Sequence, residues 1–165
     1  MTEFTIHGIP GSPFVRAALI TLEEKGASYR LAPLAPGQHR ADPYLSLNPF
    51  GRIPTLVHGD FVLYEAQAIL RYLDRVLPTP ALTPVDPRAA ARMDQIMNIS
   101  DWYLFQGVGN VIGFQRIIGP RLMGLTPDLA AIEAAMPAAH RVIDVIDGLL
   151  GDQSYMAGDL SLIHI

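Results

Sequence analysis

Ser12 is the first residue of the chain whose type and setting could support chemistry. It follows a glycine- and proline-rich turn at 8–11 and precedes Pro13 and a run of apolar residues. Serine is a favourable N-cap and proline suits the first helical position, so a helix should begin here. A hydroxyl at a helix N-terminus can cap its own helix, or it can donate a hydrogen bond to a bound anion. These residues alone favour the cap.

A second stretch with chemical potential lies at 48–57, with the sequence NPFGRIPTLV. It begins as a turn and continues as a short apolar strand headed by Pro54. Because proline lacks an N–H and restricts the residue before it, Ile53 should be extended, with its N–H and C=O free for a peptide-like ligand. We expect the Ile53-Pro54 bond to be cis. A plain start of a buried strand is the simpler interpretation.

Composition limits the classes of protein to consider. Of 165 residues, 50% are hydrophobic and 17% are charged, which suits one ordinary soluble domain or two small ones. The net charge of −4 and the lack of a Lys/Arg run argue against nucleic-acid binding. The absence of cysteine excludes disulfides and thiolate chemistry by the protein itself. Neither a signal peptide nor a membrane-spanning stretch is recognisable, so we expect a cytoplasmic protein.

The elements that must position these residues follow from hydrophobic periodicity. Strands are predicted at 4–7, 29–34, 54–57 and 61–64, and helices at 12–26 and 65–77. A helix between two strands is a βαβ unit, whose strands are parallel. The order βαβ-ββα predicts an α/β thioredoxin-like N-terminal domain over 1–77, with a mixed four-stranded sheet.

The second half of the chain has only helical patterns. Four prolines punctuate 78–87, which we interpret as an interdomain linker to an all-α domain over 88–165. One helix is predicted from Arg88 to about Gly119 and another from 126–128 to about Leu150. Pro137 should kink or split the latter.

Four motifs in the right order resemble those of glutathione transferases. The turn at 8–12 resembles the catalytic-serine turn of phi- and theta-like members, and 48–54 resembles the family block that contains a cis proline. Segments 64–73 and 155–162 resemble a helix block of the first domain and a signature of the helical domain. The chain is therefore identified as a phi/theta-like, serine-type member of the family.

The resemblance implies that Ser12 is catalytic. Glutathione must be a thiolate to attack an electrophile, whereas a free cysteine thiol has a pKa of about 8.5. A hydroxyl donor at a helix N-terminus would stabilise the thiolate. Gly11, Ile53 and Pro54 would complete the contacts to this part of glutathione.

The two ends of glutathione need charged partners. Glu65 would bind the ammonium group of the γ-glutamyl end. The N-terminal amides of the following helix would bind the carboxylate of that same γ-glutamyl end. The family usually has serine at Ala66, so a side-chain hydrogen bond worth about 1.5–3 kcal/mol is lost and weaker binding is expected.

Three basic residues, His39, Arg40 and Arg52, would hold the glycyl carboxylate. Each could instead be a solvated loop residue, and Glu65 could simply interact with its helix dipole. A metal role for His39 is disfavoured, because no second ligand stands at a suitable spacing.

The resemblance also implies a hydrophobic electrophile as second substrate and a homodimer. The candidates to line the electrophile site are Trp102, Tyr103, Phe105 and Phe114, although aromatic residues at helical spacing more often belong to a core or a subunit contact. Phe50 resembles an aromatic key that some members insert into the neighbouring subunit. Burial within its own domain would explain Phe50 as well.

The chain end departs from the family pattern. Members continue beyond the equivalents of Ser161 and Leu162 into a core helix, which begins with a capping box of Ser/Thr and Asp. Here His164 occupies the position of the acid and Ile165 is last. We interpret the chain as C-terminally truncated.

These inferences converge on a cytoplasmic glutathione transferase that acts in detoxification, with glutathione as co-substrate and no cofactor or metal. A glutathione-dependent peroxidase or isomerase could use the same site. A non-catalytic, transferase-like binding or regulatory protein is an alternative of another class, because fold does not determine function. Ala66 and the shortened helical domain favour this alternative, whereas Ser12, His39 and Glu65 favour the enzyme.

Overall fold

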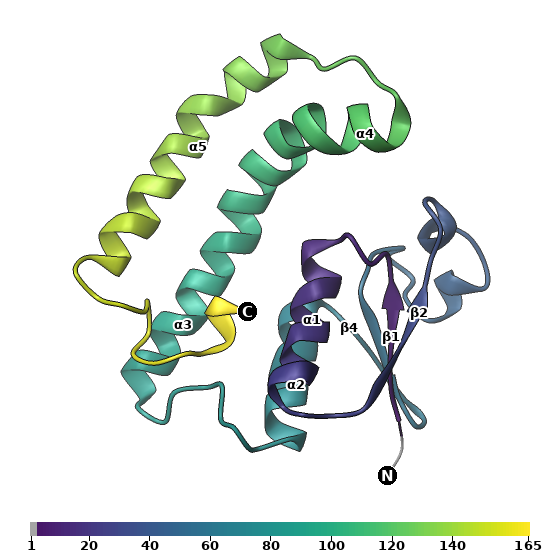
Figure 1. Ribbon diagram of the computed structural model, residues 1–165, viewed down its shortest axis with the longest axis vertical. Coiled ribbons are helices and arrows are strands. Elements are labelled where there is room, and N and C mark those ends of the chain that lie inside the picture. Colours follow the sequence, from purple (N-terminus) through teal and green to yellow (C-terminus); the bar gives the residue numbers. More distant parts are fainter. Residues whose placement is uncertain (1–2) are drawn as a thin grey trace. The chain divides into compact units, whose positions relative to one another are not determined.

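The computed structural model describes residues 3–165 (Figure 1). The chain divides into two compact units, the first ending at Thr83 and the second covering Pro84–His164. Both fall into the order expected from the sequence, with strands confined to the first unit and helices filling the second.

The first unit is built on a mixed four-stranded sheet. Its strands are β1 (Phe4–Gly8), β2 (Tyr29–Pro33), β3 (Thr55–His58) and β4 (Phe61–Tyr64), in the spatial order β2-β1-β3-β4. β1 is parallel to β2 and antiparallel to β3, and β3 is antiparallel to β4. The predicted thioredoxin-like arrangement is confirmed.

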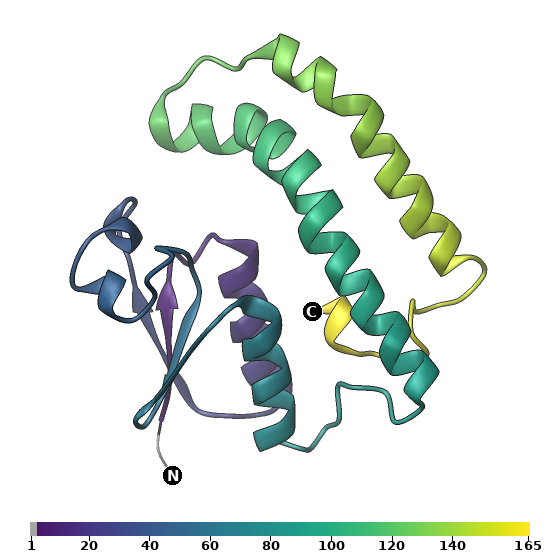
Figure 2. The ribbon, with the colours of Figure 1, turned by 180° about the vertical axis from the view of Figure 1, so that it is seen from behind.

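Two helices cover one face of this sheet. Figures 1 and 2 show α1 (Pro13–Glu24) and α2 (Ala66–Val76) side by side against it. The side chains at the centre of this layer are 0% exposed: Ile6, Val15, Leu22, Leu56, Ile69 and Leu73. Full burial of one such side chain contributes about 1.5–3 kcal/mol, so this core holds both helices on the sheet.

A buried ion pair lies near the end of the first unit and joins its helices to the segment that follows α2. Lys25 Nζ lies 2.5 Å from Asp74 Oδ1 and also donates to the carbonyl of Pro80. The Leu82 N–H donates to Asp74 Oδ1 at 2.9 Å, and the Thr83 hydroxyl donates to Oδ2 at 2.5 Å. Residues 80–83, within the proline-rich segment, are thereby bonded to α1 and α2.

The second unit begins with a helix whose winding changes along its length. Asp86 caps α3 (Pro87–Ile99) by accepting from the Ala89 N–H at 2.8 Å. The chain continues as the π-helical segment η3 (Ser100–Ile118) and as α4 (Gly119–Met123). The single predicted helix therefore changes its hydrogen-bonding pattern at Ser100, and three glycines of low helix propensity lie in the π-helical part.

The last long helix, α5 (Leu129–Leu150), packs along η3, and the two run side by side in both views (Figures 1 and 2). Pro137 lies inside α5 without interrupting it, so of the two predicted outcomes, a kink or a split, the split is wrong. Pro137 and Glu133 are both exposed, and water can reach the Glu133 carbonyl that lacks a helical donor.

His164 partly replaces the acid of the expected capping box. The Ser161 N–H donates to His164 Nδ1 at 3.1 Å, where the family's carboxylate would accept. His164 ends the short 3-10 helix η4 (Leu162–His164). Within residues 3–165, none of the helices has the length and apolarity needed to cross a membrane.

Candidate functional site

The loops that carry the predicted site residues open at one end of the sheet. Gly8 at the end of β1 pairs with Pro33 at the end of β2. His7 pairs with Thr55 at the start of β3, and Thr55 pairs with Tyr64 at the end of β4. One end of the sheet therefore carries all four connections: the segments that follow β1, β2 and β4, and the segment that leads into β3. We refer to it as the site end.

Ser12 lies directly before α1, with φ of −70° and ψ of 130°. Its carbonyl accepts the Arg16 N–H at 2.9 Å, but its side chain makes no capping hydrogen bond. The interpretation of Ser12 as a side-chain cap is therefore wrong, and its half-buried hydroxyl is not used by its own helix. Gly11 beside it is exposed, with open space where a Cβ would stand.

Glu65 precedes α2 in an uncommon backbone conformation. Its φ of 71° and ψ of 114° make it the one non-glycine residue with positive φ among those the structure describes. Such conformations cost of order 1–3 kcal/mol and cluster at functional sites. The exposed Glu65 side chain does not cap α2, and the Ala66 N–H belongs to the first turn, whose donors lack helical acceptors. A carboxylate and the Ala66 N–H thus meet at this helix start.

The segment before β3 is fixed by buried polar side chains. The Ile53-Pro54 bond is cis, as predicted. The carbonyl of Arg52 accepts from the Tyr44 hydroxyl at 2.6 Å and from Asn48 Nδ2 at 2.9 Å. Tyr44 also bonds Thr55 Oγ1 at 2.6 Å. Neither Tyr44 nor Thr55 was predicted from the sequence. The one signal that could have identified Tyr44 is its position as an aromatic residue in a polar connection.

His39 lies in the short 3-10 helix η1 (Gln38–Arg40), which follows β2. Its Nδ1 is buried and lacks a hydrogen-bond partner within the described chain. Burial lowers the pKa of His39, and the nearby positive charge of Arg40 lowers it further. Gly51, with φ of 57°, brings the next loop close, because a Cβ there would lie 3.0 Å from the His39 carbonyl. The Arg40 and Arg52 residues are exposed on these adjoining loops.

Three aromatic residues are far more exposed than a core position allows. Phe50 is 68% exposed and packs edge-on to Tyr64 at a centroid distance of 5.8 Å. Trp102 and Tyr103 on η3 are 68% and 63% exposed. The interpretation of these three side chains as core residues is therefore wrong.

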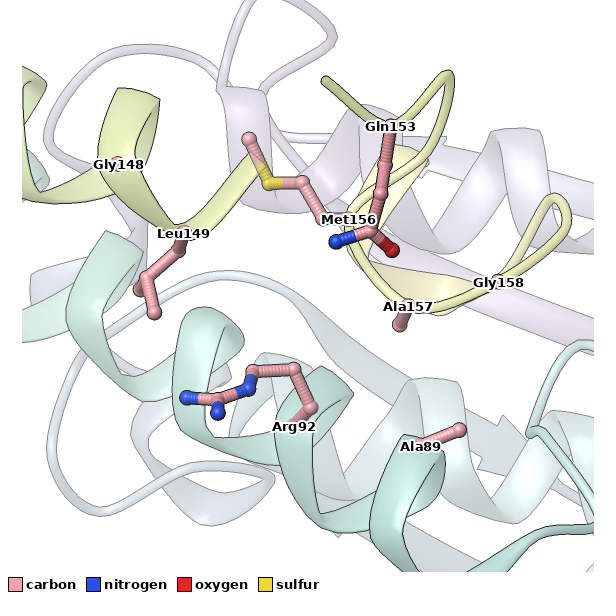
Figure 3. A pocket seen from close by; sticks show the side chains of 8 residues that line it. All are labelled: Ala89, Arg92, Gly148, Leu149, Gln153, Met156, Ala157 and Gly158. Atoms are coloured by element: carbon pink, nitrogen blue, oxygen red, sulfur yellow. The ribbon is translucent and has the colours of Figure 1, made fainter. Parts of the chain in front are cut away.

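A separate pocket of about 310 Å³ lies within the second unit (Figure 3). Arg92 from α3 and Leu149 from α5 line it together with Gln153, Met156 and small residues. None of the predicted site residues is among them. Over residues 3–165, no group of three or more His, Asp or Glu side chains could hold a metal ion.

The sheet order and the helical second unit define a thioredoxin-like protein with an appended helical domain. Residues 6–81 match the profile of the glutathione S-transferase N-terminal domain. The chain is 33% identical to glutathione S-transferase 3 of Zea mays over 161 residues, which cover 96% of the chain and 72% of that protein. The chain belongs to the glutathione S-transferase family and resembles its phi and theta members.

Solved structures agree with this assignment. A theta class glutathione S-transferase from Xanthomonas axonopodis pv. citri, solved with glutathione bound, matches with a TM-score of 0.86 at 30% identity. The match covers 99% of this chain and 78% of that one. Glutathione transferase F7 from Populus trichocarpa matches with a TM-score of 0.85 at 26% identity, over 97% of this chain and 77% of that one.

Proposed function

We propose that this protein is a glutathione transferase that conjugates glutathione to a hydrophobic electrophile. The observation that carries the proposal is the Ser12 hydroxyl, which stands at the N-terminus of α1 without capping it. In this position Ser12 donates a hydrogen bond to the glutathione sulfur and holds it as a thiolate.

The energies involved suit this role. Moving a thiol pKa from about 8.5 to about 6.5 requires roughly 2.7 kcal/mol of preferential thiolate stabilisation. A hydrogen bond to a charged acceptor contributes about 1.5–3 kcal/mol, and a helix N-terminus adds about 0.3–1 kcal/mol. Ser12 and the first turn of α1 together can therefore supply the required stabilisation.

The rest of the site end provides partners for the rest of glutathione. Glu65 binds the γ-glutamyl ammonium, while the first N–H groups of α2, including that of Ala66, bind its carboxylate. The backbone of Ile53 before Pro54 and that of Gly11 bind the peptide portion. Because alanine lacks the hydroxyl usual in the family, we expect binding weaker than in relatives with serine at this position.

The glycyl carboxylate is bound by the basic residues of the adjoining loops. His39 lies on η1 beside these residues, and Gly51 brings the neighbouring loop close to its carbonyl, which supports a shared role. The exposed Arg40 and Arg52 add positive charge near the same ligand end.

Exposed aromatic rings support two further parts of the proposal. Trp102 and Tyr103 line the electrophile site, and Phe50 inserts into a second subunit to form a homodimer. All three large side chains are more than 60% exposed in the single chain, and exposed apolar patches mark binding or subunit-contact sites. The proposed role is detoxification in the cytoplasm.

Calorimetric titration of the purified protein with glutathione, followed by turnover assays with chlorodinitrobenzene, tests the proposal. Saturable binding with turnover that falls strongly in Ser12→Ala is the expected result. Binding without turnover on a panel of electrophiles would support the non-catalytic alternative, which the loss of the serine hydroxyl at Ala66 also favours. A folded protein that binds no glutathione would contradict both.

A further inference from the structure

We infer that Tyr44 is a positioning residue for glutathione binding, acting through the backbone on both sides of Ile53-Pro54. The inference rests on the proposed function and adds a residue to it. Tyr44 opens the 3-10 helix η2 (Tyr44–Ser46) and is only 3% exposed, so it cannot touch a ligand extensively itself. Its effect on binding must pass through its hydrogen bonds.

The Tyr44 hydroxyl contacts residues on either side of the dipeptide. It donates to the Arg52 carbonyl at 2.6 Å and lies 2.6 Å from Thr55 Oγ1. A phenol has one proton to donate, so the Thr55 hydroxyl donates to Tyr44 Oη while Tyr44 donates to Arg52. The resulting chain runs from Thr55 through Tyr44 to Arg52. Thr55 is 0% exposed, which keeps water from competing for these bonds.

Fixing the Arg52 carbonyl also fixes the next N–H. The Arg52–Ile53 bond is not among the cis peptide bonds, and the peptide unit is planar. The Ile53 N–H therefore points away from the side to which Tyr44 and Asn48 hold the Arg52 carbonyl. Because the two donors use both lone pairs of that carbonyl, rotation of the plane would break two hydrogen bonds within a buried network.

Asn48 extends this support into the preceding turn. It is 1% exposed, donates to Arg52 and accepts the Phe50 N–H at 3.0 Å through Oδ1. Asn48 thus holds the turn shape, whereas Tyr44 connects that turn to the first residue of β3. Tyr44 is the side chain of this network that bonds residues both before and after Ile53-Pro54.

Replacing Tyr44 by phenylalanine tests the inference, because it removes the hydroxyl and keeps the ring. We expect the glutathione Kd and KM to rise about three- to tenfold, the loss typical of the one hydrogen bond, to the Arg52 carbonyl, that fixes the Ile53 N–H. The kcat at saturating glutathione and the KM for chlorodinitrobenzene should stay within about twofold, since Ser12 is untouched. A purely structural role would not separate KM for glutathione from the other constants.

Tyr29→Phe is the matched control. This substitution likewise removes a tyrosine hydroxyl, but that hydroxyl donates at 2.6 Å to Glu23 on the exposed surface of the same unit. Its glutathione Kd should equal that of the original protein. Thr55→Val should weaken binding and Thr55→Ser should restore it, which provides the test even if Tyr44→Phe does not fold.

Two failures are distinguishable. If the unmodified protein does not bind glutathione, the proposed function fails and the inference fails with it. If the unmodified protein binds glutathione but folded Tyr44→Phe, or Thr55→Val in its place, binds equally well, only the role of Tyr44 is overturned.

Discussion

Lys25 and Asp74, 49 positions apart in the sequence, form a buried ion pair at 2.5 Å. The side chains are 0% and 8% exposed, and Asp74 also accepts from Leu82 and Thr83. A single carboxylate therefore binds the end of α1 and the last residues of the first unit to α2. This arrangement joins three segments of the domain that carries the proposed glutathione site.

Asp74→Asn should destabilise the first unit by about 3–5 kcal/mol, because it leaves the Lys25 ammonium buried without a charge partner. Denaturant unfolding measures this difference. Glu3→Gln is the control: Glu3 lies 3.9 Å from Arg30, with both side chains more than half exposed, and its loss should change stability little. Equal effects of the two substitutions would contradict this prediction.

The same pair makes stability depend on acid pH. Although burial opposes the charged form, hydrogen bonds from Lys25, Thr83 and Leu82 and the Lys25 charge leave the pKa of Asp74 below its ordinary value. The folded state therefore binds this proton more weakly than the unfolded state. The contribution is complete above the unfolded pKa of about 3.9 and is lost as pH falls through the lower folded pKa. Asp74→Asn should flatten this part of the stability–pH curve, and an unchanged curve would argue against it.

Ala66→Ser should tighten glutathione binding by restoring a side-chain donor at the first residue of α2. A hydrogen bond to a charged carboxylate contributes about 1.5–3 kcal/mol, so the Kd should fall at least about tenfold. Ala68→Ser, the same substitution at an exposed position of α2, should leave the Kd unchanged. Calorimetry with both variants checks this, and equal Kd values for the two would refute the assignment of Ala66.

Glu65→Gly should change stability and binding in opposite directions. Glycine tolerates positive φ better than glutamate, so the variant should gain up to about 1 kcal/mol in unfolding free energy. Glutathione binding should weaken because the ammonium partner is gone. Unfolding and titration of the same sample measure both effects. Unchanged affinity would remove Glu65 from the site.

The sequence predicts those parts of the fold that local patterns determine. The parallel β1–β2 pair follows from the βαβ rule, and the cis bond expected before Pro54 is present, whereas the strand order β2-β1-β3-β4 was not predicted. The Lys25–Asp74 pair could not be predicted, because it joins distant segments through tertiary packing. The positive φ of Glu65 could not be predicted either, since glutamate does not favour it and only the surrounding fold imposes it.

In the helical unit as well, local sequence patterns predict some features but not others. Asp128 and Pro127 indicate the start of α5 locally, and the Asp128 side chain does accept from Ala131 at 3.0 Å. The continuity of α5 through Pro137 was not predicted, because proline is locally a helix-breaking signal. At the site end, residue types suggested Ser12 and His39, but the Tyr44 network requires the folded loop.

The most direct test of the central claim is an ultraviolet pH titration of the glutathione thiolate bound to the original protein and to Ser12→Ala. If Ser12 stabilises the thiolate, bound glutathione will ionise well below the free thiol pKa of about 8.5, and Ser12→Ala will move ionisation back toward that value while still binding glutathione. Identical titrations for the two proteins would contradict the role of Ser12 in the proposed transferase mechanism.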